Sequence, residues 1–191
     1  MICVIDTETG GLQARYHEAI SICILPLKDD FSINTEIPPF KTDIRPTFPD
    51  RLQTQALKVN GRTVEELAQA PVRADTLRAF FEWRKAHLQE NKIAPLAQNW
   101  SFDKGFVEAW LDWDNNHPNI ISSFFNYQAR DLQRVALWFC DRAKLKGQSM
   151  PFGGVSLAKL APALQVVNPA PHTAYGDCVT TALCYQKLVN M

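Results

Sequence analysis

The chain opens on Met1-Ile-Cys-Val-Ile-Asp6, a short apolar and β-branched run that continues into Thr7-Glu8-Thr9-Gly10-Gly11. Such a run predicts a buried strand with acidic residues at its end. Because strand side chains alternate, Asp6 and Glu8 point the same way, roughly 7 Å apart at about 3.3 Å per residue. Two such carboxylates repel each other unless a positive group lies between them, and hard divalent cations prefer oxygen ligands. Taken alone, the pair is equally typical of solvated strand-end carboxylates.

Outward from this strand, the pattern passes from strands to helices interleaved with strands. The expected strands are 19–27, an extended edge at 31–44 bent by two prolines, 93–98 and 122–129. The expected helices are 52–60, a short one capped by Thr63, 76–88, 102–113, one capped by Asp131, 156–164 and 173–189, with a polar loop at 144–154. This order predicts an α/β or α+β protein with a mixed sheet. No repeat or linker interrupts it, so residues 1–191 are expected to form a single domain.

The composition excludes several classes of protein. Of 191 residues, 46% are hydrophobic, and 20 basic residues balance 20 acidic ones, which argues against a disordered chain. The most apolar stretch, residues 20–27, is far shorter than the ~20 residues that a membrane span needs. No signal peptide is visible, and the five cysteines contain no C-x-x-C pair, so we expect a cytoplasmic protein with reduced cysteines and no membrane partner.

Two further clusters combine polar residues with predicted helix starts. The first, Asn99-Trp-Ser-Phe102-Asp103, places an acidic residue at a strand-to-helix junction, where a carboxylate also complements the helix N-terminus. The second, His172-Thr-Ala-Tyr-Gly-Asp177, joins an imidazole to a carboxylate at the start of the last helix. Viewed singly, an ordinary helix-capping acid and a structural histidine are equally acceptable readings.

Together the three clusters resemble the DEDDh branch of the DnaQ-like 3′–5′ exonuclease family, which includes proofreading exonucleases, oligoribonuclease and ribonuclease T. The similarity runs from Ile2 to about Leu183, with the three motifs in the family's order. A sister branch carries a tyrosine four residues before the last acid, where this chain has Thr173. The resemblance implies a ribonuclease H-like α/β fold, in which helices flank a mixed five-stranded sheet. Gln98 and Trp100 depart from the family's second motif without removing a catalytic group.

The resemblance also implies an activity: metal-dependent hydrolysis of terminal phosphodiesters in single-stranded nucleic acid, releasing nucleoside 5′-monophosphates. By this analogy, Asp6, Glu8, Asp103 and Asp177 are catalytic and bind two divalent ions, Mg²⁺ or Mn²⁺. His172 would then be the general base, since its ordinary pKa of about 6.5 suits proton transfer near neutral pH. Two bound dications would add a charge of +4 to a chain whose formal net charge is zero, and this charge would attract a phosphate backbone.

Other residues are assigned less specific roles. Thr9 and Leu12, after the first motif, are matching candidates for holding the terminal nucleotide, and Phe106 is a candidate for stacking on a base. Phe102 and Trp100 are interpreted as core residues. His17, His87 and His117 are expected at the surface, and Arg142, Lys144 and Lys146 in a solvated loop.

The substrate remains open between DNA and RNA 3′ ends. The sequence slightly favours DNA, which would suit a polymerase or repair complex as partner, and the alternative is an exoribonuclease that trims short RNA. A third hypothesis is an inactive nuclease-like module that binds nucleic acid or a polymerase. The presence of all five catalytic-type residues argues against that module. The sequence does not indicate the oligomeric state.

Overall fold

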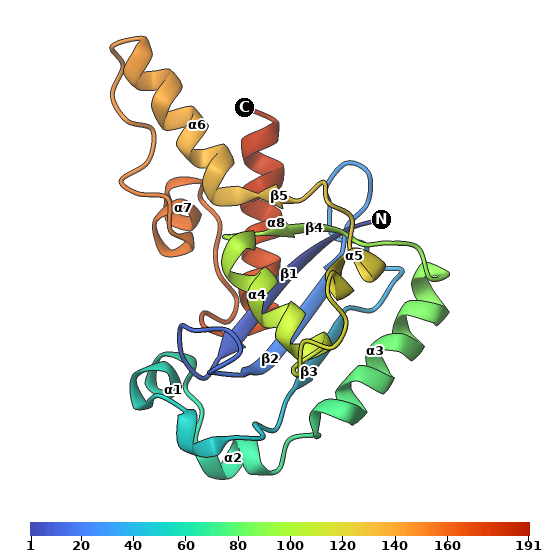
Figure 1. Cartoon of the computed structure of the whole chain (residues 1–191). Coiled ribbons are helices and arrows are strands. Elements are labelled where there is room, and N and C mark those ends of the chain that lie inside the picture. Colours follow the sequence, from blue (N-terminus) through green and yellow to red (C-terminus); the bar gives the residue numbers. More distant parts are fainter.

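The computed structural model describes all residues, 1–191, and contains a mixed five-stranded sheet (Figure 1). The strands are β1 (Ile2–Thr9), β2 (Ala19–Pro26), β3 (Phe40–Asp43), β4 (Ala94–Ala97) and β5 (Arg130–Asp131). Their order is β3-β2-β1-β4-β5. The β1–β2 and β2–β3 pairs are antiparallel, whereas β1–β4 and β4–β5 are parallel. The predicted α/β fold class and the mixed sheet are confirmed.

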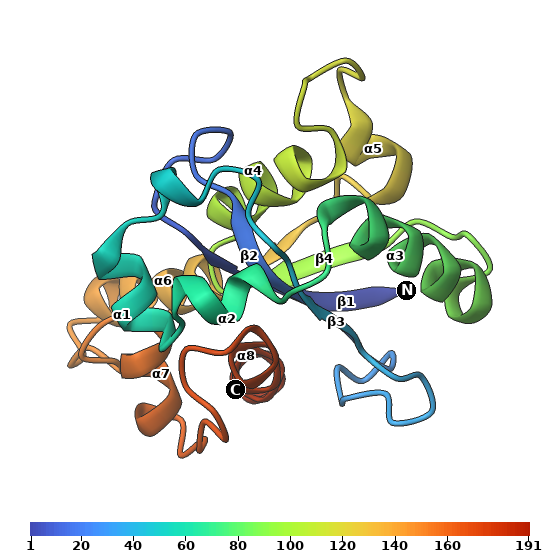
Figure 2. The same ribbon diagram turned by 90° about the horizontal axis from the view of Figure 1, so that it is seen from below.

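Helices cover both faces of this sheet (Figure 2). They are α1 (Thr54–Asn60), α2 (Val64–Ala68), α3 (Arg73–Leu88), α4 (Trp100–Leu111), α5 (Ile120–Phe124), α6 (Leu132–Leu145), α7 (Leu157–Ala163) and α8 (Ala174–Val189), with a 3₁₀ turn at Pro49–Arg51. On one face, α8 packs against β1 and β2 and is flanked by α6 and α7. On the other face, α4 packs against β1 and β4, and α3 packs against β3. The strand β1 is therefore covered from both sides.

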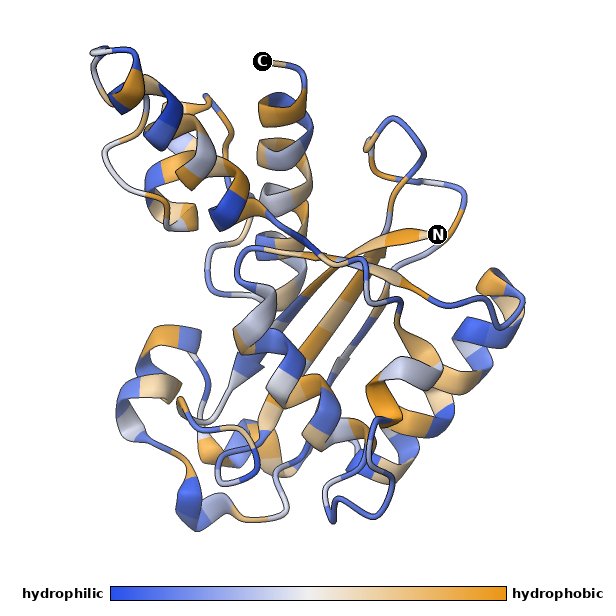
Figure 3. Cartoon of the chain, turned by 45° about the horizontal axis from the view of Figure 1, so that its top comes forward, coloured by the Kyte–Doolittle hydropathy of each residue, from blue (hydrophilic) through white to orange (hydrophobic).

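The burial of β1 explains its composition. Cys3, Val4 and Ile5 have no exposed surface, and the apolar colour of the central strands continues along the sheet (Figure 3). The two cores differ in character: the α8 side contains cysteines and aliphatic residues, and the α3–α4 side is rich in aromatic rings. All five cysteines are buried, where they pack as small apolar side chains. At the end of β1, the pairing with β2 is irregular between Glu8 and Thr9.

The structure contains the two helix caps that the sequence predicts from neighbouring residues. Thr63 and Glu66 form the predicted capping box, in which each side chain accepts a hydrogen bond from the other's backbone. The carboxylate of Asp131 accepts a hydrogen bond from the Arg134 backbone N–H and caps α6 as predicted. Helix α6 continues to Leu145, two residues into the segment 144–154 that was predicted as a loop.

The strand predicted at 122–129 is wrong. Residues Ile120–Phe124 form helix α5, and the fifth strand is the two-residue segment Arg130–Asp131 that follows. Ile121, Phe124 and Phe125 pack against the aromatic core, because apolar residues three and four apart share one side of a helical turn. The two serines between them are exposed, as the helical spacing requires.

No helix in the chain is both long enough and apolar enough to cross a bilayer.

Candidate active site

Three of the predicted acidic residues meet at the end of β1. Asp6 and Glu8 project from β1 to the face that α8 covers, and Asp177 reaches them from the first turns of α8. One carboxylate oxygen from each residue lies within 4.8 Å of the other two. A strand and a helix far apart in the sequence thus converge on one point, as the combined motifs predicted.

The fourth acid, Asp103, approaches from α4 on the opposite face and is held by Thr7. Its Oδ1 accepts hydrogen bonds from the Thr7 backbone N–H at 3.0 Å and from the Thr7 hydroxyl at 2.8 Å. Thr7 points away from Asp6 and Glu8, as the alternation of the strand requires. Asp103 is therefore adjacent to the three-carboxylate group but not part of it, although its charge still acts on Asp6.

Burial and mutual repulsion raise the pKa values of this group. Burial, followed by the charges of Asp103 and Glu8, raises the pKa of Asp6 well above its ordinary value. Burial and the charge of Asp177 raise the pKa of Glu8 to about 7. Burial also raises the pKa of Asp103 to about 7, against the hydrogen bonds from Thr7. The folded chain therefore holds carboxylates that are costly to ionise without a nearby cation.

The donor set fits a hard divalent cation. Glu8 Oε1 is buried and has no hydrogen-bond partner, which leaves a carboxylate oxygen free inside the acidic group. Buried polar atoms are normally paired, and an orphaned carboxylate oxygen among other carboxylates is the expected ligand of Mg²⁺ or Mn²⁺. Asp6, Glu8 and Asp177 are the residues that could hold such an ion directly.

His172 lies in a short loop that leads into α8, and it is exposed. Its backbone adopts the left-handed conformation, with φ of 59°. The loop is attached to Asp177 through Asn168, whose Nδ2 donates to Asp177 Oδ1 at 2.7 Å while its own Oδ1 accepts from the Ala170 N–H at 3.1 Å. Burial raises the pKa of Asp177, and the bond from Asn168 and the proximity of His172 lower it in part. Sequence reasoning missed Asn168, because nothing in the sequence connects it to Asp177.

A pocket of about 280 Å³ opens beside Glu8, and we call it the Leu12 pocket. It is lined by Thr7, Glu8, Thr9, Gly11, Leu12, Gln53, Gln55, Ala56, Val59, Asn60 and Phe102. Leu12 is 77% exposed, so its side chain is free to contact a ligand. Thr9 lines the pocket as well, but its hydroxyl donates to Gly11 O at 2.7 Å, and its carbonyl accepts from Asn60 Nδ2. Thr9 therefore shapes the pocket wall more than it offers a free polar group.

The prediction that Phe106 contacts substrate is wrong. Phe106 is 1% exposed and belongs to the aromatic core under the sheet. Phe102, one turn earlier and 5.0 Å away between ring centroids, is half-buried and lines the Leu12 pocket. Residues four apart share one face of a helix, so periodicity alone did not separate the inner ring from the outer one. Trp100 is half-buried against the same core.

The glycine pair after β1 accommodates a histidine that was predicted at the surface. His17 is only 4% exposed, and its Nδ1 accepts a hydrogen bond from the Gln13 N–H at 3.0 Å. A Cβ on Gly11 would lie 2.4 Å from the His17 ring, and a Cβ on Gly10 would lie 2.5 Å from Leu52. The glycines therefore allow close packing of the loop. His117 is exposed as predicted, and His87 is half-buried.

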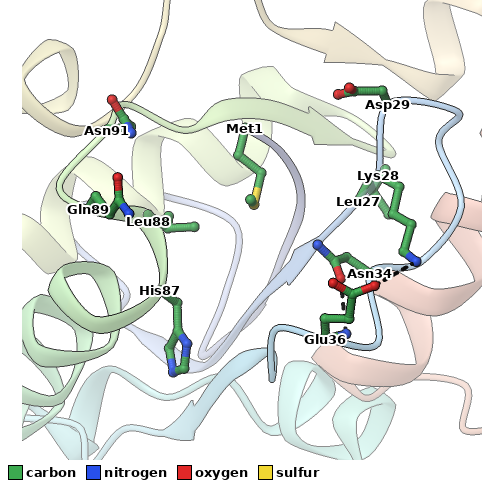
Figure 4. A pocket seen from close by; sticks show the side chains of 10 residues that line it. All are labelled: Met1, Leu27, Lys28, Asp29, Asn34, Glu36, His87, Leu88, Gln89 and Asn91. Carbon is green, nitrogen blue, oxygen red and sulfur yellow. Dashed lines mark hydrogen bonds and ion pairs between the residues drawn. The ribbon is translucent and has the colours of Figure 1, made fainter.

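A pocket of about 600 Å³ lies at the other end of β1, and we call it the Met1 pocket (Figure 4). His87 and Asp29 are among its lining residues. Its charged side chains include an ion pair between Lys28 Nζ and Glu36 Oε1 at 3.1 Å, drawn as a dashed line. It contains none of the predicted site residues.

A family model described as an exonuclease, RNase_T, matches residues 3–185. The chain belongs to this exonuclease family. The resemblance to DnaQ-like exonucleases that the three motifs indicated is thereby confirmed, and with it a hydrolytic enzyme class. Among curated relatives, the exonuclease is 26% identical to ribonuclease T of Cronobacter sakazakii over 98% of this chain and 80% of the relative. It is 25% identical to ribonuclease T of Citrobacter koseri over 98% of this chain and 83% of the relative.

Solved structures confirm the fold of this exonuclease. A crystal structure of E. coli exonuclease I in complex with a dT13 oligonucleotide superimposes with a TM-score of 0.76 at 17% identity, over all of this chain and 41% of that chain. Cell-death related nuclease 4 gives a TM-score of 0.73 at 17% identity, over all of this chain and 64% of that chain. The exonuclease thus spans less than two thirds of either structure. At these identities the likeness supports the ribonuclease H-like fold alone.

Proposed function

We propose that residues 1–191 form a single metal-dependent 3′–5′ exonuclease domain, which removes nucleoside 5′-monophosphates from single-stranded nucleic acid. The observation that carries this proposal is the half-buried, mutually repelling group of Asp6, Glu8 and Asp177, with a buried and unpartnered Glu8 oxygen. Its neighbours are an exposed histidine on one side and the Leu12 pocket on the other. In a purely structural cluster of acids, this Glu8 oxygen would instead have a cation or a hydrogen-bond donor as its partner.

In this proposal, the four acids and His172 have separate roles in hydrolysis. Asp6, Glu8 and Asp177 would hold divalent ions, Mg²⁺ or Mn²⁺, with Asp103 supporting them from α4. Such ions stabilise the negative charge that develops on the phosphoryl and leaving oxygens. His172 would accept the proton of the attacking water as the phosphorus–oxygen bond to the 3′ oxygen breaks. Its exposed position leaves the imidazole accessible to both water and substrate.

The Leu12 pocket would receive the 3′-terminal nucleotide. Leu12 would press on the base, and Phe102 takes the role that was predicted for Phe106, because its ring lines the pocket. Base stacking on an aromatic ring is worth ~1–3 kcal/mol and does not depend on sequence. Thr9 would contact the sugar of this nucleotide, because it forms part of the pocket wall.

DNA is the proposed preferred substrate, and RNA is the second candidate because the curated relatives carry the name ribonuclease T. A DNA-directed activity would place the enzyme with a polymerase or repair complex in the cytoplasm. The structure of exonuclease I with an oligonucleotide supports single strands as the substrate form. The decision between sugars depends on how the 2′-hydroxyl is tolerated.

The test is a time course on 5′-labelled and 3′-labelled single strands of DNA and RNA with equal sequence, in Mg²⁺, Mn²⁺ or EDTA. We expect 5′-labelled strands to shorten stepwise, 3′-labelled strands to release labelled mononucleotide at once, and EDTA to stop both. Asp6→Asn is the matched inactive control. Internal fragments, shortening from the 5′ end, or cleavage that persists in EDTA would contradict the proposal.

A further inference from the structure

A second hollow next to the acidic group carries positive charge. It has a volume of about 290 Å³, and we call it the Lys41 pocket. It is lined by Ser21, Ile22, Lys41, Thr42, Asp43, Arg62, Thr173, Ala174 and Tyr175. It shares no lining residue with the Leu12 pocket. The first residues of α8 border it, and the same helix carries Asp177 one turn later.

The register of the sheet places this pocket relative to the carboxylates. Through β2, Asp6 lies in the same cross-strand row as Lys41, and Glu8 in the same row as Asp43. Residues in one row point to the same face of a sheet. Lys41 and Asp43 thus share a face with Asp6 and Glu8, and a two-strand separation corresponds to ~10 Å at about 4.8 Å per strand. A short stretch of nucleic acid spans that distance.

The side chains of the pocket leave one cation unpaired. Arg62 donates to Asp43 Oδ1 at 2.6 Å, so these two charges largely neutralise each other. Lys41 forms no ion pair and is exposed, and its Nζ lies 4.9 Å from the centroid of the Tyr175 ring. Tyr175 is 41% exposed, so part of the ring surface remains accessible.

Positive charge beside an accessible aromatic ring is the combination that binds single-stranded nucleic acid, in which phosphates alternate with stackable bases. The negative charge of Asp43 does not repel a phosphate strongly, because Asp43 is already paired with Arg62. Arg62 also keeps further N–H donors, since a guanidinium has five. A peptide ligand is less well matched, because the pocket has little apolar lining beyond Ile22, Ala174 and Tyr175.

We propose that the Lys41 pocket binds a backbone phosphate of the substrate strand upstream of the scissile bond. Lys41 supplies the charge, Tyr175 offers a surface to the adjacent base, and Arg62 is a second donor that Asp43 holds in place. This rests on the function proposed above, which puts the terminal nucleotide in the separate Leu12 pocket. It makes substrate affinity dependent on strand length, because a dinucleotide contains only the scissile phosphodiester.

The experiment compares Lys41→Gln with the wild-type enzyme on a dinucleotide and on an eight-nucleotide single strand, at several salt concentrations. For the longer strand, we expect KM to rise roughly three- to ten-fold, as for the loss of one charged contact. The slope of log affinity against log salt should flatten by about 0.7, the value for one single-strand phosphate contact. The turnover number on either substrate and the KM for the dinucleotide should stay within two-fold of wild type.

Lys85→Gln, which removes an exposed charge on α3, is the matched control and should change none of these values. Lys41→Arg should restore the KM for the longer strand. Anisotropy titrations of the longer strand in an Asp6→Asn background give the same comparison without turnover. An unchanged KM and salt slope in Lys41→Gln would overturn the proposal, and so would an equal loss on the dinucleotide. If the wild-type enzyme itself did not cleave, the proposed function would fail instead.

Discussion

The two ends of β1 carry hollows that differ in size and in the state of their charges. At the start of the strand, the Met1 pocket encloses about 600 Å³, and its Lys28 and Glu36 neutralise each other at 3.1 Å. At the end of the strand, the Leu12 pocket encloses about 280 Å³, beside carboxylates that raise one another's pKa values. The larger hollow contains a paired cation and anion, whereas the smaller one adjoins an unpartnered buried oxygen.

From this difference we expect the chemistry beside the unpartnered Glu8 oxygen at the end of β1, and not in the larger Met1 pocket. A folded chain normally avoids buried like charges, because desolvation and repulsion both raise their free energy. Where such charges persist, they mark a site that a ligand or an ion completes. The comparison between the two ends can be tested with matched pairs of the same residue type.

The largest effect is expected from a pair of aspartates, one at each end of β1. Asp6→Asn removes a carboxylate from the three-residue group and should lower the rate of hydrolysis on the order of 10⁴-fold or more, as for groups that act as a unit. Asp29→Asn, in the Met1 pocket, should leave the rate unchanged. Single-turnover kinetics on a labelled oligonucleotide measure both. Comparable rates in the two variants would contradict the proposal that the catalytic acids lie at the end of β1.

A pair of histidines gives the next effect. His172→Ala should slow turnover ~10²–10⁴-fold, the range for loss of a general base, with the affinity for Mn²⁺ retained. His87→Ala, in the Met1 pocket, should have no effect on turnover. Calorimetric titration with Mn²⁺ separates two roles for His172. Lost metal affinity would identify it as a ligand.

Variants of Asn168 measure how much its hydrogen bond to Asp177 contributes to the site at the end of β1. Asn168→Ala loses the donor to Asp177 and the acceptor for the Ala170 N–H, whereas Asn168→Asp keeps the acceptor, loses the amide donor and adds a negative charge beside Asp177. If the donor orients Asp177, both variants should lower kcat by roughly ten-fold, about 1.4 kcal/mol, with unchanged melting temperatures. Wild-type kcat in Asn168→Asp alone would show that the turn, and not the donor, is what matters.

The smallest effect is on stability. Glu8 and Asp103 have pKa values raised to about 7 in the folded chain, so the folded state binds more protons than the unfolded state between about pH 4 and 7. Stability of the metal-free protein should therefore be full below about pH 4 for these groups and fall as the pH rises to 7. Melting temperatures in EDTA should drop by a few degrees from pH 5 to 8, and Mg²⁺ should restore them mainly at pH 8. An increase of the EDTA melting temperature over this range would contradict the raised values.

Much of the site could be predicted because its signals are local. The alternation of a strand places Asp6 and Glu8 on one side, and the His172 spacing from Asp177 distinguishes one branch of the family from another. The errors arose where several packings satisfy one pattern. Phe102 and Phe106 share a helix face, and only the docking of α4 on the sheet decides which ring is covered. The apolar residues of Ile120–Phe124 fit either a strand or a helical turn until the aromatic core selects the turn.

Side-chain types and local periodicity were enough to predict the strand that begins the fold, the acids and the imidazole that we propose for the chemistry, and the family to which the chain belongs. Three contacts could be seen only in the folded chain. Thr7 donates hydrogen bonds to Asp103, 96 residues away, and Asn168 donates one to Asp177. The register of the sheet places Lys41 on the same face as Asp6. The physical reason is that side-chain type and local periodicity are properties of the chain. Desolvation, repulsion and hydrogen bonding instead depend on distances in space, which separation along the chain does not specify.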